Sequence, residues 1–310
     1  MTVYTKDSSV AIILLNWNGF EFTKACIDSL FQTNDDNFEI ILVDNGSEDG
    51  SLENLKCLYP GLHFLKSPTN VGFTGGNNIG IHYAIEKGFE FILLLNNDTV
   101  VERDFLSPLV ERLKNCTACA AVQPLIYYLH EREKIWNAGG RFNNWLAKSK
   151  TIYTVADKTH PYTTDWITGC AYMVKSSVIQ QIGVLDNLYF AYFEDVDWSL
   201  RMKMAGYDLE IVPTSRIYHE AGASSKSKTV GREGFLNPRV HYLNVRNQVY
   251  QIRKYATFPF GIIAWPYHLC KIFLYAIYFM LRGRWEKLRA IGEGFLDGIK
   301  ENNLGGGSEK

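Results

Sequence analysis

The most constraining stretch of this sequence is a run of five apolar residues, 91–95, that ends abruptly in Asn96, Asn97 and Asp98. This pattern predicts a buried central strand that ends at an open polar edge. Ligands bind at the carboxyl ends of parallel strands, so Asp98 is placed for chemistry. Its carboxylate suits Mg²⁺ or Mn²⁺, ions that take further ligands from water and substrate phosphates. The alternative is that the three polar residues only cap a turn.

Strand and helix patterns alternate along the first half of the chain. Apolar runs at residues 10–15, 38–43, 62–65 and 91–95 each end in polar or glycine-rich turns, and helical patterns separate them. This alternation predicts a parallel, doubly wound α/β sheet. The length of 310 residues allows one large domain, or one domain with an appendage.

The charge balance argues against a nucleic-acid partner. The chain has 32 Lys plus Arg and 33 Asp plus Glu, without a basic stripe. Its six cysteines are scattered, several of them in apolar runs, as reduced core cysteines are. The first ten residues hold no apolar signal-peptide core, so the expected compartment is the cytoplasm.

Three of the predicted strands end in polar side chains that would meet at one edge of the sheet: Asn16 and Asn18, Asp44 and Asn45, Asn97 and Asp98. This is the arrangement of a nucleotide site at a topological switch point. Asp44 could accept a hydrogen bond from a pyrimidine imide or a ribose hydroxyl. Trp17 could stack on a base, and a core tryptophan is the equally weighted alternative.

The segment 70–80 is rich in glycine and asparagine, residues that allow a backbone to approach a ligand closely, and a helix is expected after it. It is not a Walker loop, because no Gly-Lys-Ser/Thr follows, and it lacks the G-x-G-x-x-G spacing. A metal-borne diphosphate therefore fits better than a lysine loop. Within the segment, Gly72 and Asn77 are assigned to nucleotide binding.

Three carboxylates, Glu194, Asp195 and Asp197, lie within four residues at the mouth of a predicted helix. Their mutual repulsion is unfavourable unless a site uses them. An acidic helix start, with Asp197 paired to Arg201 at i,i+4, explains Asp197 without a catalytic role. We do not extend that explanation to Asp195.

Three further residues lie in predicted loops or turns. A lone histidine is usually structural, but His219 begins a polar loop and is a candidate metal ligand. Trp166 and Gly169 belong to a small-residue turn where a sugar ring could lie. A packed structural tryptophan is the competing account of Trp166.

Together these segments resemble the family 2 inverting glycosyltransferases, and most closely the bacterial rhamnosyltransferase-like branch that builds cell-surface polysaccharide. The likeness covers roughly residues 10–250, with these motifs in order: Asn16-Trp17-Asn18, Val43-Asp44-Asn45-Gly46-Ser47, Asn70-x-Gly72-Phe73-x-Gly75-Gly76-Asn77-Asn78-x-Gly80, Leu95-Asn96-Asn97-Asp98, Phe193-Glu194-Asp195-x-Asp197-Trp198-x-Leu200-Arg201 and His219.

The resemblance implies a GT-A fold, an α/β fold with a Rossmann-like, mostly parallel sheet flanked by helices, and a C-terminal helical extension follows it. We expect a nucleotide-sugar-binding half at residues 1–125 and an acceptor-binding, catalytic half at 126–235. A helical segment at 236–304 and a flexible tail at 305–310 complete the chain.

The family's catalytic base falls on Asp195, which would accept the proton of an acceptor hydroxyl during a single inverting displacement. Glu194 would hold an acceptor hydroxyl or orient the base. The family's D-x-D metal motif falls on Asn96-Asn97-Asp98, so Asn96 replaces its first Asp. His219 stands where relatives supply a further ligand to Mn²⁺ or Mg²⁺. Nucleotide binding is assigned to Asn16, Trp17, Asn18, Asp44, Asn45, Gly72, Asn77 and Asn97, and acceptor binding to Trp166, Gly169 and Trp198.

The implied reaction moves a sugar from a nucleotide-diphosphate donor, dTDP-rhamnose or a UDP-sugar, to a hydroxyl of a glycan or lipid-linked acceptor. A sugar-phosphate nucleotidylyltransferase would need a basic, glycine-rich loop after the first strand, which residues 16–19 do not supply. A catalytically inactive scaffold that binds nucleotide sugars or glycans is compatible with Asn96, but the intact Glu194-Asp195 pair counts against it. The sequence leaves the oligomeric state open.

Residues 258–281 are strongly apolar and aromatic, with basic residues on both sides. A spanning helix needs about 20 largely uncharged residues, and His268, Lys271 and two prolines argue against one. The preferred interpretation of 258–289 is an amphipathic segment in the membrane interface, at the inner face of the cell membrane. Burial against the catalytic domain or in a dimer interface is the competing interpretation.

Overall fold

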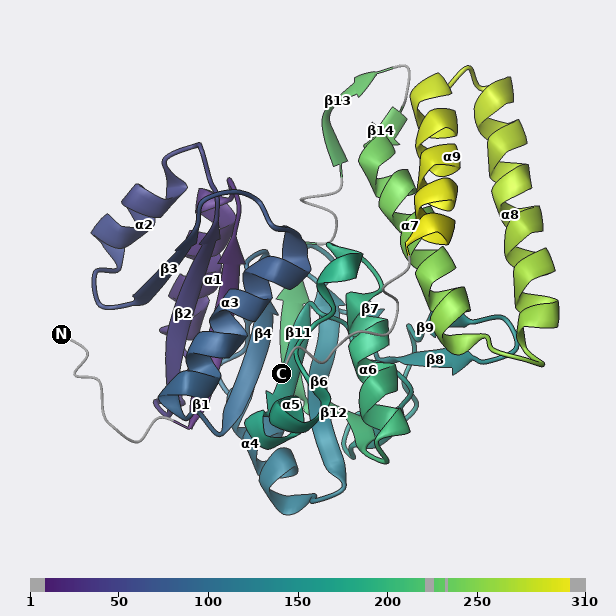
Figure 1. Ribbon diagram of the computed structural model, residues 1–310. Helices are drawn as coiled ribbons and strands as arrows, with labels where there is room; N and C mark the ends of the chain where they lie inside the picture. The colour runs from purple at the N-terminus through teal and green to yellow at the C-terminus, as the bar shows by residue number, and fades with distance from the viewer. Residues whose placement is uncertain (1–8, 221–225, 232–233, 302–310) are drawn as a thin grey trace. The chain divides into compact units, whose positions relative to one another are not determined.

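The computed structural model describes residues 9–220, 226–231 and 234–301, which form two compact units (Figure 1). The first unit comprises Met1–Arg141, Thr151–Phe190 and Glu194–Ala221, and the second comprises Phe142–Lys150, Ala191–Phe193 and Gly222–Lys310. The tail expected at 305–310 and residues 221–225 of the loop after His219 lie outside the described residues.

The first unit is built on one large mixed sheet. Its main path has the strand order β10-β12-β6-β11-β4-β1-β2-β3, and β5 and β7 pair at its side. The strands are β1 (Val10–Asn16), β2 (Phe38–Asn45), β3 (His63–Ser67), β4 (Phe91–Asn96), β5 (Thr99–Val101), β6 (Cys119–Tyr128), β7 (Ile135–Asn137), β10 (Tyr162–Thr164), β11 (Ala171–Lys175) and β12 (Asp208–His219). The halves expected at 1–125 and 126–235 share this sheet, because their boundary falls within β6.

Strands β1 to β4 are mutually parallel where they pair, as the alternating pattern predicts. Strand β11 is antiparallel to both β4 and β6, so the sheet is mostly but not wholly parallel. The chain order reverses between β1 and β4, since β2 and β3 extend from the other side of β1. This reversal is the topological switch point that the sequence predicts.

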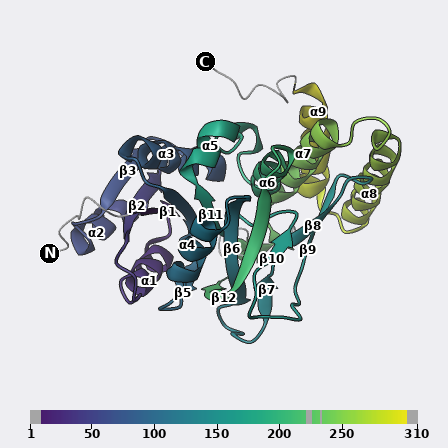
Figure 2. The same cartoon turned by 90° about the horizontal axis from the view of Figure 1, so that it is seen from below.

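Helices cover both faces of the sheet because side chains alternate between the faces along each strand. Ile12 and Leu14 pack with α1 and α4, whereas Ala11 and Ile13 pack with α3, α5 and α6. Figure 2 shows α3, α5 and α6 on one side of the strands and α1 on the other. The helices are α1 (Phe20–Leu30), α2 (Ser51–Leu58), α3 (Gly72–Lys87), α4 (Leu106–Asn115), α5 (Ser176–Ile182) and α6 (Glu194–Met204), with a 3₁₀ turn at Asn187–Tyr189.

The glycine-rich segment is helical from Gly72, so the expected loop before the helix is wrong. A Cβ at Gly76 would lie 2.4 Å from Leu15, and one at Gly80 would lie 2.7 Å from Ile13. These glycines therefore let α3 pack closely on β1. Gly72 has φ +81° and its Cβ would lie 2.4 Å from the carbonyl oxygen of Phe190, so any side chain there is excluded.

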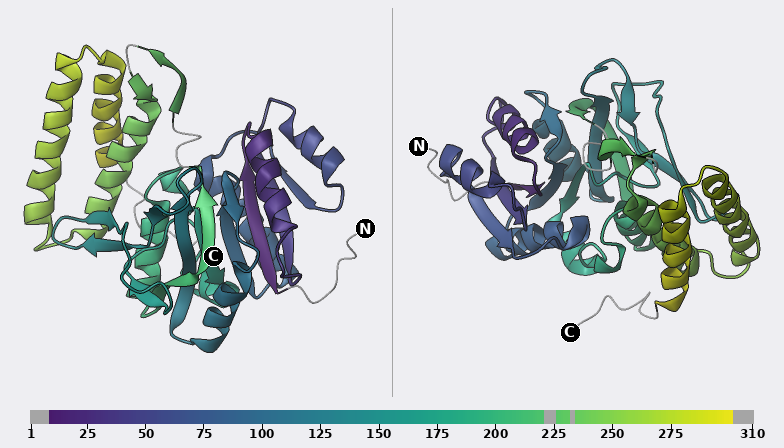
Figure 3. Two further views of the ribbon diagram at one scale, coloured as in Figure 1. Left: turned by 180° about the vertical axis from the view of Figure 1, so that it is seen from behind. Right: turned by 90° about the horizontal axis from the view of Figure 1, so that it is seen from above.

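The second unit is mainly helical, with α7 (Pro238–Tyr255), α8 (Gly261–Leu281) and α9 (Trp285–Lys300) side by side (Figure 3). It also contains the β13 (Lys226–Gly231) and β14 (Gly234–Leu236) pair, and the chain between β8 (Gly140–Asn143) and β9 (Lys148–Thr151). Gly294 and Gly298 let α9 approach α7, because a Cβ at Gly294 would lie 2.5 Å from the Tyr242 carbonyl.

Helix α8 is the one helix within the described part of the chain that is long and apolar enough to cross a membrane, by length and composition alone. Only three of its residues are buried: Ala264, His268 and Phe279. Pro266 lies inside the helix and does not end it. The rest of the second unit therefore leaves most of α8 exposed.

Candidate functional site

The predicted strand ends meet at one edge of the first unit's sheet. Asn16 pairs with Asp44 across β1 and β2, and Leu15 pairs with Asn96 across β1 and β4. Asn96 and Asp98 thus follow the strand next to the one that ends in Asn16. The sheet order alone brings the polar segments of three distant stretches together.

Asn16 is the centre of a buried hydrogen-bond network at this edge. Its Nδ2 donates to Asp44 Oδ1 at 3.0 Å, Ser47 Oγ at 3.1 Å and Ser51 Oγ at 2.9 Å. Its Oδ1 accepts from the Thr23 hydroxyl at 2.8 Å. Asn16 and Asp44 are both fully buried, so in this structure they shape the edge and are held by protein groups.

Two predicted nucleotide-binding residues also bond to the protein itself. Asn45 donates to the Gly72 carbonyl at 3.0 Å and accepts from Val71 N at 3.0 Å, which ties β2 to the start of α3. Asn77 donates to the Phe73 carbonyl at 2.9 Å within α3. Both asparagines are buried.

Trp17 and Asn18 project from this edge. The side chain of Trp17 is 50% exposed, so the core interpretation of this residue is wrong and its ring is open to solvent. Asn18 has a left-handed φ of 50°, and its Oδ1 accepts from Glu48 N at 2.8 Å. Asn97 donates to the Thr23 hydroxyl at 2.7 Å. Thr23, which the sequence analysis missed, therefore joins the first and fourth strand ends.

Asp98 and His219 are brought together by the ladder between β5 and β12. His219 pairs with Thr99 in this ladder, and Glu220 N donates to the Asp98 carbonyl at 3.0 Å. Nε2 of His219 lies 3.1 Å from Asp98 Oδ1, and both side chains are largely buried. The ring of Trp136 packs edge-on against His219, with centroids 4.3 Å apart. The structure thus places Asp98 and His219 side by side, whereas the sequence links them only through the resemblance to the glycosyltransferase family.

The Asp98–His219 pair contains buried polar atoms that lack hydrogen-bond partners. Although the contact is an ion pair, neither Asp98 Oδ1 nor His219 Nδ1 has a hydrogen-bond partner, and both atoms are buried. Burial by itself would lower the pKa of His219, but Cys170 and Asp98 raise it to about 10. An oxygen and a nitrogen donor so placed are chemically suited to a divalent cation, which would replace the proton. No group of three or more metal-ligating side chains occurs among the described residues.

Glu194 and Asp195 begin helix α6. Asp195 Oδ2 accepts from Gly169 N at 3.0 Å, and its Oδ1 accepts from Val196 N at 2.8 Å. Burial raises the pKa of Asp195, and these two N–H groups oppose that rise. Burial and the neighbouring charge of Asp195 raise the pKa of Glu194 well above its ordinary value. Each carboxyl therefore binds a proton more tightly than it would in water, which suits a group that exchanges protons with a substrate.

This burial predicts that Glu194→Gln stabilises the folded protein as the pH rises. The folded state binds the Glu194 proton more tightly than the unfolded state, so wild-type stability falls as pH rises above the ordinary value of 4.5. Gln carries no such charge, so the melting temperature of Glu194→Gln minus that of wild type should increase between pH 4 and pH 9. Glu86→Gln, which removes an exposed carboxylate on α3, is the control. Parallel melting curves for Glu194→Gln and wild type would contradict the interpretation.

One short segment connects the two candidate constellations. Gly169 N donates to Asp195, and the carbonyl of Cys170 accepts from Asn96 N at 2.8 Å. The Cys170 thiol also interacts electrostatically with His219, Asp98 and Asp195. Residues 168–170 therefore fix the carboxylate of α6 relative to the end of β4. The sequence indicated Gly169 but gave no signal for Cys170.

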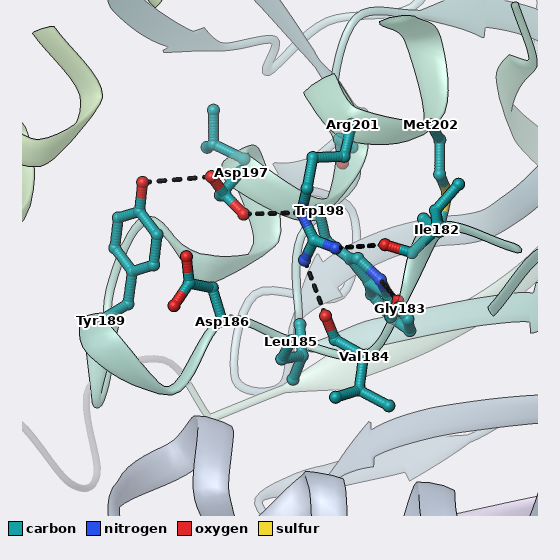
Figure 4. Close-up of polar contacts among 12 residues, drawn as sticks. Ile182, Gly183, Val184, Leu185, Asp186, Tyr189, Asp197, Trp198, Arg201 and Met202 are labelled. Carbon is teal, nitrogen blue, oxygen red and sulfur yellow. Dashed lines mark hydrogen bonds and ion pairs between the residues drawn. The ribbon is translucent and has the colours of Figure 1, made fainter. Parts of the chain in front are cut away.

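Asp197 has the structural role that its i,i+4 spacing predicts (Figure 4). Its fully buried carboxylate accepts from Arg201 Nε at 2.9 Å and from the Tyr189 hydroxyl at 3.2 Å. The two terminal nitrogens of Arg201 donate to the carbonyls of Ile182 and Val184. This network anchors α6, and with it the first turn that carries Asp195.

The two tryptophans assigned to acceptor binding are buried. Trp198 has no exposed surface, donates to the Gly183 carbonyl at 2.9 Å and packs against Tyr172, so it offers no face to a sugar. Trp166 is also buried and lies over Gly140, whose Cβ would fall 1.9 Å from the indole nitrogen. Packing is the role that the structure supports for both, which corrects the expectation. Gly169 remains beside Asp195, since its Cβ would lie 3.7 Å from that side chain.

Comparison with known proteins gives consistent results. The family model described as Glycosyl transferase family 2 matches residues 9–183, more than half of the chain. The chain is 26% identical over 232 residues to the rhamnosyltransferase WbbL of Escherichia coli K12, covering 70% of this chain and 86% of that protein. It is 23% identical over 224 residues to the N-acetylglucosaminyl-diphospho-decaprenol L-rhamnosyltransferase of Mycobacterium tuberculosis, covering 66% and 71%.

A solved structure shows the same fold. The crystal structure of GalNAc-T7 with UDP, GalNAc and Mn²⁺ superposes with a TM-score of 0.62 at 17% sequence identity. The match covers 79% of this chain and 48% of that one, so this chain spans about half the length of GalNAc-T7. The likeness confirms the expected GT-A fold, with C-terminal helices after it. By its family match and its site-bearing sheet, this chain belongs to glycosyl transferase family 2 and is similar to the rhamnosyltransferases of that family.

Proposed function

We propose that this protein is an inverting sugar transferase that uses a nucleotide-diphosphate donor, dTDP-rhamnose or a UDP-sugar, in cell-surface polysaccharide synthesis. The observation that carries the proposal is the edge at which Asp98, His219 and Asp195 are held together by residues 168–170. The rhamnosyltransferase relatives support a deoxyhexose donor, and the Mycobacterium tuberculosis relative is named for a lipid-diphosphate acceptor.

Asp195 is the group that removes the acceptor proton. The N–H groups of Gly169 and Val196 hold its two oxygens in place. The attacking oxygen would lose its proton to Asp195 as it displaces the nucleoside diphosphate from the anomeric carbon. Glu194 lies next to this carboxylate and, with its raised pKa, would hold an acceptor hydroxyl or orient the base.

Asp98 and His219 would hold a Mn²⁺ or Mg²⁺ ion at the donor diphosphate. Nε2 of His219 lies 3.1 Å from Asp98 Oδ1, and the buried Asp98 Oδ1 and His219 Nδ1 have no hydrogen-bond partner. Mn²⁺ and Mg²⁺ commonly combine few protein ligands with water and phosphate oxygens. When bound, such an ion supplies positive charge to the leaving diphosphate. Trp17, with its exposed ring, would stack on the nucleotide base.

The acceptor would be a glycan or lipid-linked sugar at the inner face of the cell membrane. Helix α8 exposes large apolar side chains along its length, among them Phe273 at 65% and Leu281 at 81%. A row of exposed large apolar side chains is typical of a membrane or protein contact. Basic residues follow the helix at Arg282 and Arg284, where they would meet anionic headgroups.

A nucleotide panel tests the donor site. Thermal unfolding would be measured with UDP, dTDP, GDP and ADP, each with and without Mn²⁺, on wild type and on Asp98→Ala. A ligand at 100 times its dissociation constant adds about 2.7 kcal/mol of stability, so one pyrimidine diphosphate should raise the melting temperature clearly. We expect the Mn²⁺-dependent part of that rise to disappear in Asp98→Ala.

The exposed carboxylate of Asp208 provides a control, because Asp208→Asn lies at the start of β12 and should keep the full shift. Absence of any shift with all four nucleotides would contradict the donor site. Nucleotide binding without transfer to any acceptor would instead favour the alternative, an inactive scaffold that binds nucleotide sugars, for which Asn96 in the metal motif is the supporting observation.

A further inference from the structure

The second unit contains a cavity of about 640 Å³ lined by residues of α7, α8 and α9. This volume lies in the range of small-molecule sites. Three cationic residues line it, Lys271 on α8, Arg284 before α9 and Lys287 on α9, together with two histidines. None of the described lining residues is an aspartate or a glutamate. The cavity therefore combines a volume open to solvent with three cationic lining side chains.

The cations of this cavity are placed for an anion. The side chain of Lys287 is only 2% exposed, so its positive charge lies inside this unit and not on its surface. Arg284 lies 5.7 Å from the ring of Tyr278 and donates to its hydroxyl at 3.4 Å. Among the described residues, neither Lys271 nor Arg284 forms an ion pair with a carboxylate.

The charges around Lys271 also favour an anion in this cavity. Burial lowers its pKa, Tyr267 raises it, and the positive charge of Lys148 lowers it. Lys148 itself donates to the Tyr267 hydroxyl at 2.8 Å. The charges of Lys148 and Lys271 thus repel each other, and a doubly charged anion beside Lys271 would relieve that repulsion.

The rest of the cavity wall is apolar and reaches the exposed surface of α8. Ile272 and Phe279 line the cavity, as do Tyr275 and Tyr278, which are also 45% and 43% exposed. Helical spacing places the exposed Leu281 and Leu274 next to Tyr278, at i+3 and i−4. A cationic cavity beside an apolar helix surface is complementary to an amphipath with an anionic head.

We propose that this cavity binds the diphosphate headgroup of a lipid-linked diphosphate, whose hydrocarbon chain lies along the exposed surface of α8. The inference rests on the proposed function, because a sugar transferase with a lipid-linked acceptor must hold such a headgroup. Phe193, which lines the cavity, directly precedes Glu194 in the chain. The chain itself therefore joins the cavity wall to the predicted catalytic carboxylates.

The test is a titration of the full chain with farnesyl diphosphate, in which isothermal titration calorimetry measures binding. We expect saturable binding that Lys271→Gln weakens about tenfold or more, since it removes one charge-assisted contact. Lys271→Arg keeps the charge and should bind within about threefold of wild type. Lys300→Gln removes an exposed lysine at the end of α9 and should bind as wild type does.

Inorganic pyrophosphate separates a lipid headgroup from a free phosphate compound. It should bind at least about tenfold more weakly than farnesyl diphosphate, because it lacks the chain that would lie on α8. Equal affinity for the two ligands would overturn the lipid assignment. Absence of saturable farnesyl diphosphate binding, or equal binding by wild type and Lys271→Gln, would overturn the site.

The same preparations would be melted with dTDP and with UDP, each with Mn²⁺. Nucleotide stabilisation of wild type and of Lys271→Gln shows that both chains are folded, so a loss of farnesyl diphosphate binding is then local to the cavity. Nucleotide binding without farnesyl diphosphate binding overturns this inference and leaves the proposed function intact. The reverse result overturns the proposed function and supports the cavity site.

Discussion

Replacing Asp195 with Asn should lower the rate of sugar transfer by about 10²- to 10⁴-fold, the usual contribution of a positioned general base. Asn can still accept a hydrogen bond from Gly169 N, which Asp195 accepts at 3.0 Å, but it cannot take the proton of an acceptor hydroxyl. The turnover number would be measured with the donor that the nucleotide panel identifies. Nucleotide binding, measured as the rise in melting temperature with the nucleotide, should be as in wild type.

Asp208→Asn makes the same chemical change at an exposed carboxylate in the same unit and should leave turnover as in wild type. This comparison separates loss of the base from a general effect of removing one negative charge. A turnover number of Asp195→Asn within a few-fold of wild type would show that another group accepts the proton, and the assignment of the base would then be abandoned.

Replacing Arg201 with Met should destabilise the first unit by about 3–5 kcal/mol, because it breaks the ion pair of the fully buried Asp197 carboxylate with Arg201. It also removes the donors to the carbonyls of Ile182 and Val184. For a unit of this size the melting temperature should fall by roughly 6 to 20 °C. Thermal unfolding followed by circular dichroism measures the change.

A matched pair elsewhere on the same unit shows how much of this effect depends on burial. Lys24 and Asp28 also pair at i,i+4, at 2.6 Å, but both side chains are about 40% exposed. Lys24→Met should therefore change stability by no more than about 0.5 kcal/mol. The double variant Asp197→Leu with Arg201→Met should recover part of the loss, since both charges of this buried pair are then removed. Equal effects of Arg201→Met and Lys24→Met would contradict the buried-pair account.

Local sequence patterns predict those parts of the site whose residues lie close together in the chain. The ends of the first strands in Asn16, Asp44 and Asn97 follow from runs of apolar residues and the turn residues after them. The pairing of Asp197 with Arg201 follows from helical spacing. Such features are visible in a sequence because helix and strand periods fix the directions of neighbouring side chains.

Patterns failed where a side chain's partner lies far along the chain. The glycines of segment 70–80 were expected to face a ligand, but Gly76 and Gly80 face Leu15 and Ile13 of β1. Trp198 was expected at the acceptor and is buried against Tyr172. A glycine or tryptophan that faces a ligand has the same local sequence pattern as one that packs in the core. The packing of elements far apart in the chain decides which of the two occurs.

The sequence by itself determined the alternation of strands and helices, the polar strand ends and the acidic start of α6, since each is written in residues that are close in the chain. Only the tertiary structure decided that His219 lies 3.1 Å from Asp98, that Gly169 N holds Asp195, and that Lys271 and Lys287 line one cavity. The physical reason is that these contacts depend on strand order and helix packing, which follow from burial of the whole core rather than from any one segment.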